Sequence, residues 1–326
     1  MPPKKKHHYV PIAYLKAFCA TDGKLWVYRK DAPEAPFRSS PDEVALQNYY
    51  YAQPLPGGGR DTDRVENRFS SLETKWPPLV ARISARECVN ADLEDLFAFV
   101  ALQRARVPSA RDAFERMLAG RVMATTRMLD RQGKLPPAPK GLEEYLDRIQ
   151  VAIDPHLSII AMVPMIQAMG LVLDRLGFVV LHNETNVDFL TSDNPVAYYD
   201  PALQGDALRP YTLPENGDAV LLMPISPRLM LYGNSVDKSR FAQRGLEYFR
   251  LIDAERVAAI NETIVRFGYE AIFANSDAVI ELVKKHAALS PTLEVAHVAT
   301  HKGQLVLYQN VFGIRERKPK WTGPTS

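Results

Sequence analysis

Hydrophobic and polar positions change their spacing near the middle of the chain. Over much of residues 63–132, apolar residues recur three and four positions apart, as on one face of a helix. After Gly177 they fall in short runs bounded by Asn, Asp, Pro and Gly, which is typical of strands. The pattern predicts an α+β fold, with a helical bundle in the N-terminal half and a mostly antiparallel sheet with covering helices in the C-terminal half.

Other segments complete this outline. Pro108 should divide the long helical segment or kink it. The stretch 157–173 is nearly all apolar, but it is short for a membrane span and contains Pro164 and Gln167, so it predicts a buried core helix kinked at the proline. Further predicted elements are a strand at 23–29, a linker at 135–140, a short helix at 143–151, helices at 254–274 and 276–288, and a final strand at 305–312.

Composition places the chain among ordinary globular proteins. Of its 326 residues, 46% are apolar and 24% are charged. The two cysteines lack Cys-x-x-Cys spacing, which favours a reducing compartment over a disulfide framework. No apolar stretch follows the first basic residues, so they do not resemble a signal peptide. We expect a cytoplasmic protein without a membrane partner.

The basic charge is concentrated near the two ends. Residues 4–6 and 315–320 hold seven Lys and Arg residues against the single acid Glu316, so the rest of the chain is net acidic. Such basic ends are usually solvated, but they could also bind a nucleic acid through salt-sensitive contacts. The acidic body argues against broad nonspecific binding of duplex nucleic acid.

A stretch rich in histidine and tyrosine, HHYVPIAYLKAF, spans residues 7–18. Neutral imidazole is a metal ligand or a general base near neutral pH, and adjacent histidines on an extended segment point to opposite sides. Pro11 is suited to the first turn of a helix whose Tyr14 and Phe18 form an apolar stripe. His7 and His8 therefore mark either a functional site or a buried anchor for the N-terminal segment.

Two helices supply candidate partners for these histidines. Glu66 and Glu73 are seven residues apart, hence on one helical face, where they could hold Mg²⁺ or Mn²⁺ or form a solvated, salt-bridged surface. Gln103 follows an apolar run and should face inward. Arg106 could clamp a carboxylate or phosphate, or simply complement the dipole at the end of its helix.

A second polar cluster ends a predicted strand. Ser192, Asp193 and Asn194 precede Pro195, so they could be ligands or could form an ordinary Asx turn. Asn261 lies on an otherwise apolar helical face, and a buried amide there should brace a neighbouring loop. The sequence has no G-x-S-x-G, H-E-x-x-H or G-x-G-x-x-G motif.

Several of these segments together resemble a known family. HHYVPIAYLKAF is similar to the N-terminal signature of a largely bacterial family, Domain of Unknown Function 4238. Similar segments follow in the same order: VENRFSSLE, LQRAR, TSDNPV and PISP. The resemblance implies one family-wide domain over 1–320, and one site formed by a shared set of polar residues. That set is His8, Glu66, Gln103, Arg106, Asp193 and Asn194.

The linker leaves a subdivision open, into a mainly helical region at 1–140 and a strand-rich region at 141–314, followed by a basic tail at 315–326.

The resemblance supplies no reaction, so function is argued from residue types. The first hypothesis is a metal-dependent hydrolase of phosphodiesters or nucleic acid, in which His8, Glu66 and Asp193 hold Mg²⁺ or Mn²⁺ and Arg106 stabilises phosphate charge. The residues expected to bind ligand or brace this site are His7, Tyr9, Gln103, Ser192, Asn194 and Asn261.

The alternative is a non-catalytic regulatory protein that binds an anion or a peptide and whose His-Tyr-Val-Pro network is structural. The sequence sets neither the substrate nor the oligomeric state.

Overall fold

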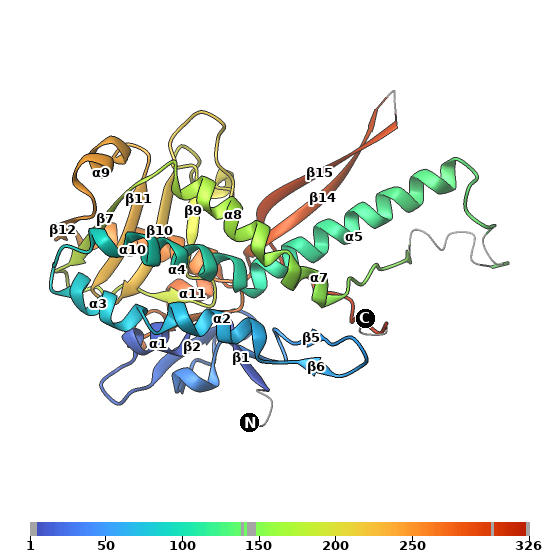
Figure 1. Cartoon of the computed structure of the whole chain (residues 1–326). Helices are drawn as coiled ribbons and strands as arrows, with labels where there is room; N and C mark the ends of the chain where they lie inside the picture. Colours follow the sequence, from blue (N-terminus) through green and yellow to red (C-terminus); the bar gives the residue numbers. More distant parts are fainter. Residues whose placement is uncertain (1–4, 138–139, 142–147, 301–302, 324–326) are drawn as a thin grey trace.

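A five-stranded sheet forms the centre of the molecule (Figure 1). The structure, a computed structural model, describes residues 5–137, 140–141, 148–300 and 303–323. The strand order is β12-β7-β11-β10-β9, and only β12 and β7 are parallel. The strands are β7 (Gly177–Asn183), β9 (Ala197–Tyr199), β10 (Val220–Ser226), β11 (Leu229–Asn234) and β12 (Glu247–Leu251).

This sheet is buried on both faces, which explains the nearly continuous apolar runs of β7 and β10. Phe178 and Val180 of β7 pack into one hydrophobic cluster, whereas Val179 and Leu181 pack into the other. The first cluster lies under helices α3 (Trp76–Ser84), α4 (Leu93–Arg106) and α8 (Met162–Leu173). The second lies against α10 (Ala254–Phe267) and α11 (Ile280–His286).

A smaller sheet combines strands from the N-terminal region with strands from the second half of the chain. Its order is β3-β2-β13-β8, with β2 (Leu25–Arg29), β3 (Phe37–Ser39), β8 (Thr191–Ser192) and β13 (Ala271–Ala274). The α+β class is confirmed, but the predicted N-terminal helical bundle followed by a C-terminal sheet is not matched, because helices and strands interleave. β2 agrees with the strand predicted at 23–29, whereas the other early strands have only two or three residues each, so local periodicity did not reveal them.

The remaining N-terminal elements are short. They are β1 (Lys6–His8), α1 (Ile12–Leu15), β4 (Leu46–Asn48), β5 (Gln53–Pro54), β6 (Arg60–Asp61) and α2 (Arg64–Glu73). β1 pairs with β4, and β5 pairs with β6. Helix α9 (Lys238–Arg244) lies between β11 and β12.

The prediction of a buried, proline-kinked helix at 157–173 is wrong. The segment forms two helices, α7 (Pro155–Ile160) and α8, and only 28% of the window Pro155–Leu173 is buried. One side packs on α4, while side chains such as Leu171, 71% exposed, face outward. Apolar residues all round the helix concealed which face is buried. Pro164 lies in the first turn of α8, where its missing N–H costs little.

By length and composition alone, this is the stretch among the described residues that could cross a membrane.

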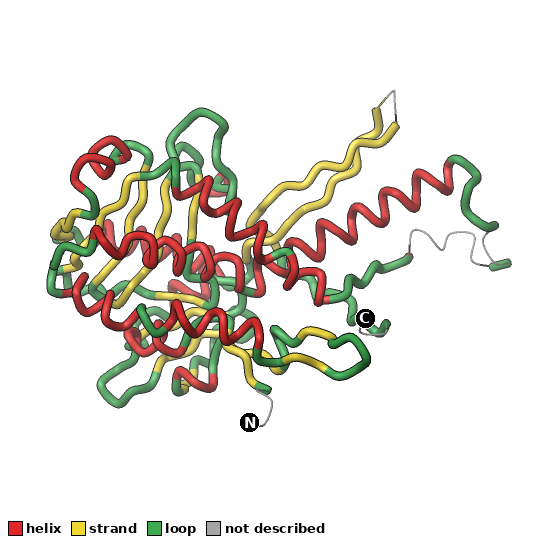
Figure 2. Tube along the Cα trace, in the orientation of Figure 1, coloured by secondary structure: helices red, strands yellow, loops and turns green. Residues whose placement is uncertain are grey.

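An arm extends away from the sheets (Figure 2). It consists of helix α5 (Pro108–Arg131) and a hairpin of β14 (Ser290–Thr300) and β15 (Gly303–Gly313). Pro108 does separate α4 from α5, as predicted. The helix predicted at 143–151 falls mainly on residues outside the described ranges, as do some residues of the 135–140 linker and of the 315–326 tail.

Candidate functional site

The His-Tyr-Val-Pro segment lies between strand β4 and helix α4. His7 pairs with Gln47 of β4, and its side chain is fully buried. Pro11 then precedes α1, whose Tyr14 is buried and donates a hydrogen bond to the carbonyl oxygen of Pro224 at 2.7 Å. The segment is therefore an integral component of the core.

Arg106 is the centre of the contacts around this segment. Its guanidinium is buried and donates to three acceptors, which are Tyr51 Oη at 3.1 Å, Glu73 Oε1 at 2.5 Å and the carbonyl oxygen of His8 at 2.5 Å. Arg106 thus binds a carboxylate of the chain itself through one nitrogen, and its predicted role toward a ligand stays a prediction. We call Arg106, Tyr51, Glu73, Gln103 and residues 7–9 the motif network.

His7 and Gln103 complete the motif network. The backbone N–H of Tyr51 donates to His7 Nδ1 at 2.8 Å, so a neutral ring carries its proton on Nε2, which lies 3.8 Å from Glu66 Oε2. Gln103 is buried, as predicted, and donates to the carbonyl oxygen of Tyr9 at 3.0 Å. Both side chains bind protein groups.

His8 points away from His7, as the extended backbone predicts. Its Nε2 contacts the carbonyl oxygen of Asp42 at 3.1 Å, and only a protonated nitrogen can donate to a carbonyl. Burial lowers the pKa of His8 below its ordinary value of 6.5, an effect that the Asp42 carbonyl opposes.

The Ser192–Asn194 turn is buried at the edge of the smaller sheet. Both carboxylate oxygens of Asp193 accept backbone N–H groups, from Tyr269 at 2.8 Å and Glu270 at 2.7 Å. Burial, helped by the charge of Glu270, raises the pKa of Asp193 to about 7. Ser192 Oγ accepts the N–H of Asn194 at 3.1 Å, so the turn is closed by a serine hydroxyl and not by the Asx turn that the sequence suggested.

Asn261 braces a loop, as predicted. Its Oδ1 accepts the N–H of Leu190 at 3.1 Å, and its Nδ2 donates to the carbonyl oxygen of Asp188 at 2.8 Å. The buried amide thus ties α10 to the segment that leads into the Ser192–Asn194 turn.

The three predicted metal ligands have separate partners. His8 binds the Asp42 carbonyl, Glu66 lies beside His7, and Asp193 binds backbone amides. Among the residues that the structure describes, no three or more His, Cys, Asp and Glu side chains are grouped so as to hold a metal ion. The magnesium or manganese site stays a prediction.

A cavity of about 940 Å³ lies outside the motif network. It is lined by residues of β4–β6, the first turns of α5 and α7, the pair Tyr269 and Glu270, and the segment 315–321. Cavities of this size accept ligands as large as a nucleotide. We call this space the cavity and the segment 315–321 its C-terminal wall.

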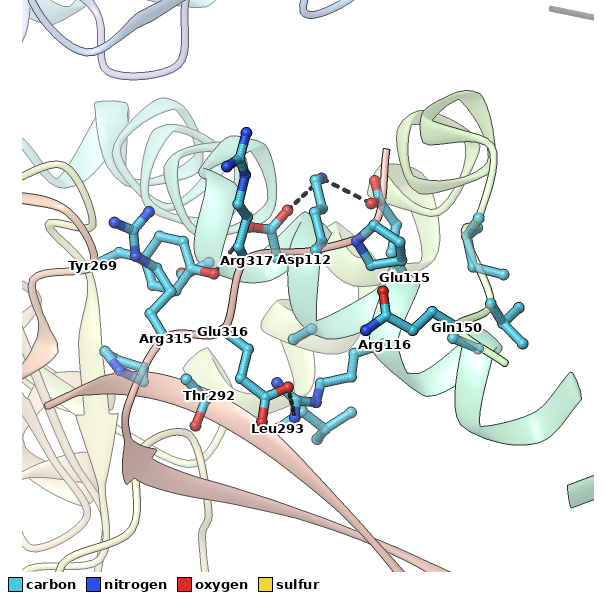
Figure 3. Close-up of a pocket in the computed structure, with 18 residues that line it drawn as sticks. Asp112, Glu115, Arg116, Gln150, Tyr269, Thr292, Leu293, Arg315, Glu316 and Arg317 are labelled. Atoms are coloured by element: carbon cyan, nitrogen blue, oxygen red, sulfur yellow. Dashed lines mark hydrogen bonds and ion pairs between the residues drawn. The ribbon is translucent and has the colours of Figure 1, made fainter. Parts of the chain in front are cut away.

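Ion pairs fix the C-terminal wall along α5. Lys318 Nζ donates to Asp112 Oδ1 at 2.7 Å and to Glu115 Oε2 at 2.8 Å, while Arg116 binds Glu316 at 2.8 Å (Figure 3). Although burial alone would lower it, the two carboxylates hold the pKa of Lys318 above its ordinary value. The basic tail is therefore attached to the body at these residues.

Arg315 pairs with Glu270 on the same wall, and Tyr269 donates to Asp112 Oδ2 at 2.9 Å. Burial raises the pKa of Glu270, and Arg315 opposes that shift. Asp154, the remaining acid of the cavity, caps α7 by accepting the N–H of His156. Each carboxylate that lines the cavity thus accepts at least one hydrogen bond.

Three cations that line the cavity lack an ion pair of this kind in the described part of the chain. Arg60, Arg317 and Lys320 are exposed and form no ion pair with any residue in the described ranges. Figure 3 shows Arg317 without a dashed line to its guanidinium. Arg60 lies over the ring of Tyr49, 5.9 Å from its centroid. The unpaired charge of the cavity is therefore positive.

Two buried nitrogen atoms of the cavity also have no hydrogen-bond partner within the described portion of the chain. They are Trp321 Nε1 and His156 Nδ1. Buried polar atoms are normally paired, so these two nitrogens are exceptions in the lining of the cavity.

Sequence reasoning missed the residues of this cavity. The available signal was a complementarity of charge, since Asp112 and Glu115 are one helical turn apart and a basic segment follows later in the chain. Nothing in the sequence brought the two segments together.

Comparisons with known proteins give one match. A family model described as "Protein of unknown function (DUF4238)" matches residues 6–278. No curated protein and no solved structure matches the chain. The match includes the motif network and the Ser192–Asn194 turn, and it ends before the C-terminal wall.

Proposed function

This chain belongs to the DUF4238 family, and because that membership brings no reaction with it, we propose a function from the cavity: the protein binds a single-stranded nucleic acid there. The observation that carries this proposal is positive charge without an ion pair in the described residues, beside aromatic side chains that line the cavity. It is the anion-binding alternative with its ligand specified.

The charges of the cavity favour a phosphate backbone. Its carboxylates are engaged, as described above, whereas Arg60, Arg317 and Lys320 have no counterion among the described residues. Such cations bind phosphates and release condensed counterions, which makes the affinity depend on salt. Arg317 and Lys320 lie on either side of Lys318 in the sequence of the C-terminal wall, so they can contact different phosphates of one strand.

The aromatic groups favour unpaired bases. Tyr49 and Trp321 line the cavity, and bases stack on such rings whatever their sequence. The ring of Tyr50, which also lines the cavity, is already covered by the guanidinium of Arg111 at 4.0 Å. In a duplex the bases are already stacked and paired, so the single strand is the better ligand.

The overall charge supports the same choice. The chain carries 40 Lys and Arg residues against 38 Asp and Glu residues, so it offers no broad basic surface for a duplex. A confined site with a few unpaired cations is instead suited to a short single-stranded segment or its end.

The hydrolase prediction concerns the same class of ligand, because a nucleic acid strand is a chain of phosphodiesters. Metal-assisted hydrolysis would need carboxylates free to hold the ion near a phosphate, whereas Lys318 binds both Asp112 and Glu115. We therefore propose binding as the function, and hydrolysis is tested in the same experiment.

The test is fluorescence anisotropy with fluorescein-labelled 12-mers of dT and of U, each with a duplex of equal length for comparison. Wild type should bind the single strands more tightly than the duplexes, with an affinity that falls as salt rises. Removing two cations in Arg317→Gln/Lys320→Gln should weaken binding and make the salt slope shallower by about 1.4. Lys238→Gln, an exposed lysine on α9, is the matched control.

Equal affinity of the double variant and wild type, or absence of binding to every single strand, contradicts the proposal. The same reactions, run with EDTA or with Mn²⁺ and analysed on a gel, show whether the strand is cleaved. Cleavage that requires Mn²⁺ and is lost in both His8→Ala and Asp193→Ala, while these variants remain folded, would support the hydrolase.

A further inference from the structure

The β14–β15 hairpin is a two-stranded sheet that stands apart from the other sheets (Figures 1 and 2). Each strand has 11 residues, and the register runs from Ser290↔Gly313 to Thr300↔Gly303. One face packs on α5 at Gly120, where a Cβ atom would lie 2.8 Å from Val295 Cγ1. A glycine at this position therefore allows the hairpin to approach the helix closely.

The outer part of the opposite face of the hairpin is aliphatic and exposed, whereas the pair Glu294 and Gln309 lies on the same face nearer the body. Ala296 pairs with Leu307, and Val298 pairs with Leu305, so these four side chains share one face. Val298, Leu305 and Leu307 are 42%, 50% and 46% exposed. A two-stranded hairpin is marginally stable on its own, and this one is covered on one face only.

The outer edge of β15 lacks every usual protection against pairing. Exposed edge strands generally carry charged residues, proline or a bulge, which prevent the addition of another strand. β15 reads GQLVLYQNVFG, with no charged residue and no proline, and its ladder to β14 is continuous from Gly303 to Gly313. Within the described residues, β14 is the strand with which β15 pairs.

From this edge and this face we infer that β15 is a dimer interface, and that its partner is β15 of a second copy of this chain. Two copies related by a two-fold axis place the strands antiparallel, and the two hairpins then form one four-stranded sheet. The aliphatic faces become continuous across the axis.

Charge favours a second copy at β15. Pairing a strand antiparallel with its own copy brings the residues near the two-fold axis close to their own counterparts, so a charge near the middle of the strand would be repelled by its symmetry mate. β15 has none, whereas β14 carries Glu294 and Pro291, which make it a poor edge for self-pairing. The projection of the hairpin from the body leaves room for the second molecule (Figure 1).

The test is the mass of the purified full chain, measured by light scattering after size-exclusion chromatography over a range of concentrations. Wild type should approach twice the 36.6 kDa of one chain. Leu307→Lys places a charge next to its own copy and should return the protein to one chain at the same concentration. Val236→Lys replaces an apolar residue that is 79% exposed on the body, and this control should remain dimeric.

Hydrogen exchange gives a second, independent measurement on wild type. Backbone amides of residues 305–310 should exchange more slowly at concentrations where the dimer forms, while those of the five-stranded sheet should not change. A wild type that stays monomeric, a Leu307→Lys variant that stays dimeric, or exchange at 305–310 that is independent of concentration would each overturn the inference.

Discussion

The motif network and the cavity both contain arginines and tyrosines, but their polar groups have different partners. In the motif network, Arg106 is buried and bound to a tyrosine, a carboxylate and a carbonyl of the chain. In the cavity, Arg60 and Arg317 are exposed and unpaired among the described residues. The comparison teaches that the polar groups of the most conspicuous sequence motif are bound to the chain itself, while exposed cations without an ion pair in the described residues lie in an inconspicuous region of the chain.

The largest expected effect is on the motif network. Arg106→Met removes a buried cation and leaves Glu73, Tyr51 and the His8 carbonyl without their donor, which should lower the free energy of unfolding by about 3–5 kcal/mol. Urea denaturation measures this change. A loss below about 1 kcal/mol, the range of a surface pair, would mean that the network does not support the fold.

Its matched control is another ion-paired arginine. Arg116 binds Glu316 at the surface, and Arg116→Met should cost about 1 kcal/mol or less because both partners are exposed. If both variants lost the same free energy of unfolding, the buried arginine would stabilise the fold no more than the surface one.

The next effect concerns the cavity. Trp321→Ala should weaken binding of a single-stranded 12-mer by about 1–3 kcal/mol, because a stacking surface is lost. Trp321→Phe keeps a ring but lacks the indole N–H, so its affinity should be intermediate. Anisotropy with labelled strands measures both variants. Wild-type affinity in Trp321→Ala would exclude this tryptophan from the site.

The third prediction is a pH dependence in the motif network. Because the pKa of His8 is lower in the folded state than its ordinary 6.5, the unfolded chain binds more protons just below pH 6.5. The contribution of His8 to stability should therefore fall as pH falls through 6.5, whereas Asp193, whose pKa is raised to about 7, contributes in the opposite direction. His8→Gln keeps a donor for the Asp42 carbonyl and should reduce this fall, measured as the difference from wild type in urea denaturation between about pH 5 and pH 8.

Because burial also lowers the pKa values of His182 and His286, some of the pH dependence should persist in His8→Gln. A variant with the same slope as wild type would show that His8 titrates equally in both states.

The smallest expected effect is on the stability of cavity variants. Arg60→Gln and Arg317→Gln should each change the free energy of unfolding by less than about 0.5 kcal/mol, since neither side chain has an ion pair among the described residues. Each should nevertheless make the salt slope of strand binding shallower by about 0.7. Strong destabilisation would mean that these arginines belong to the fold.

Much of the local structure could be predicted from the sequence. The break at Pro108, the opposite directions of His7 and His8, the inward amide of Gln103 and the brace at Asn261 all follow from backbone geometry and periodicity, and the structure has each of them. Such features depend on residues that are close together in the sequence.

Long-range pairing could not be predicted in the same way. β2 pairs with β13 across more than two hundred residues, and Lys318 reaches Asp112 from the far end of the chain. A strand of five residues or a single lysine carries no signal of its partner. The interleaved fold and the cavity therefore became visible only once the chain was folded.

The C-terminal wall also has an evolutionary consequence. The family model ends at residue 278, so β14, β15 and the wall all follow the matched region. A relative that shared only the matched region would keep the motif network but would have a cavity open on one side and an uncovered α5. Recognition of a ligand and recognition of another copy could then diverge among relatives through exchange of one terminal stretch, without altering the inherited core.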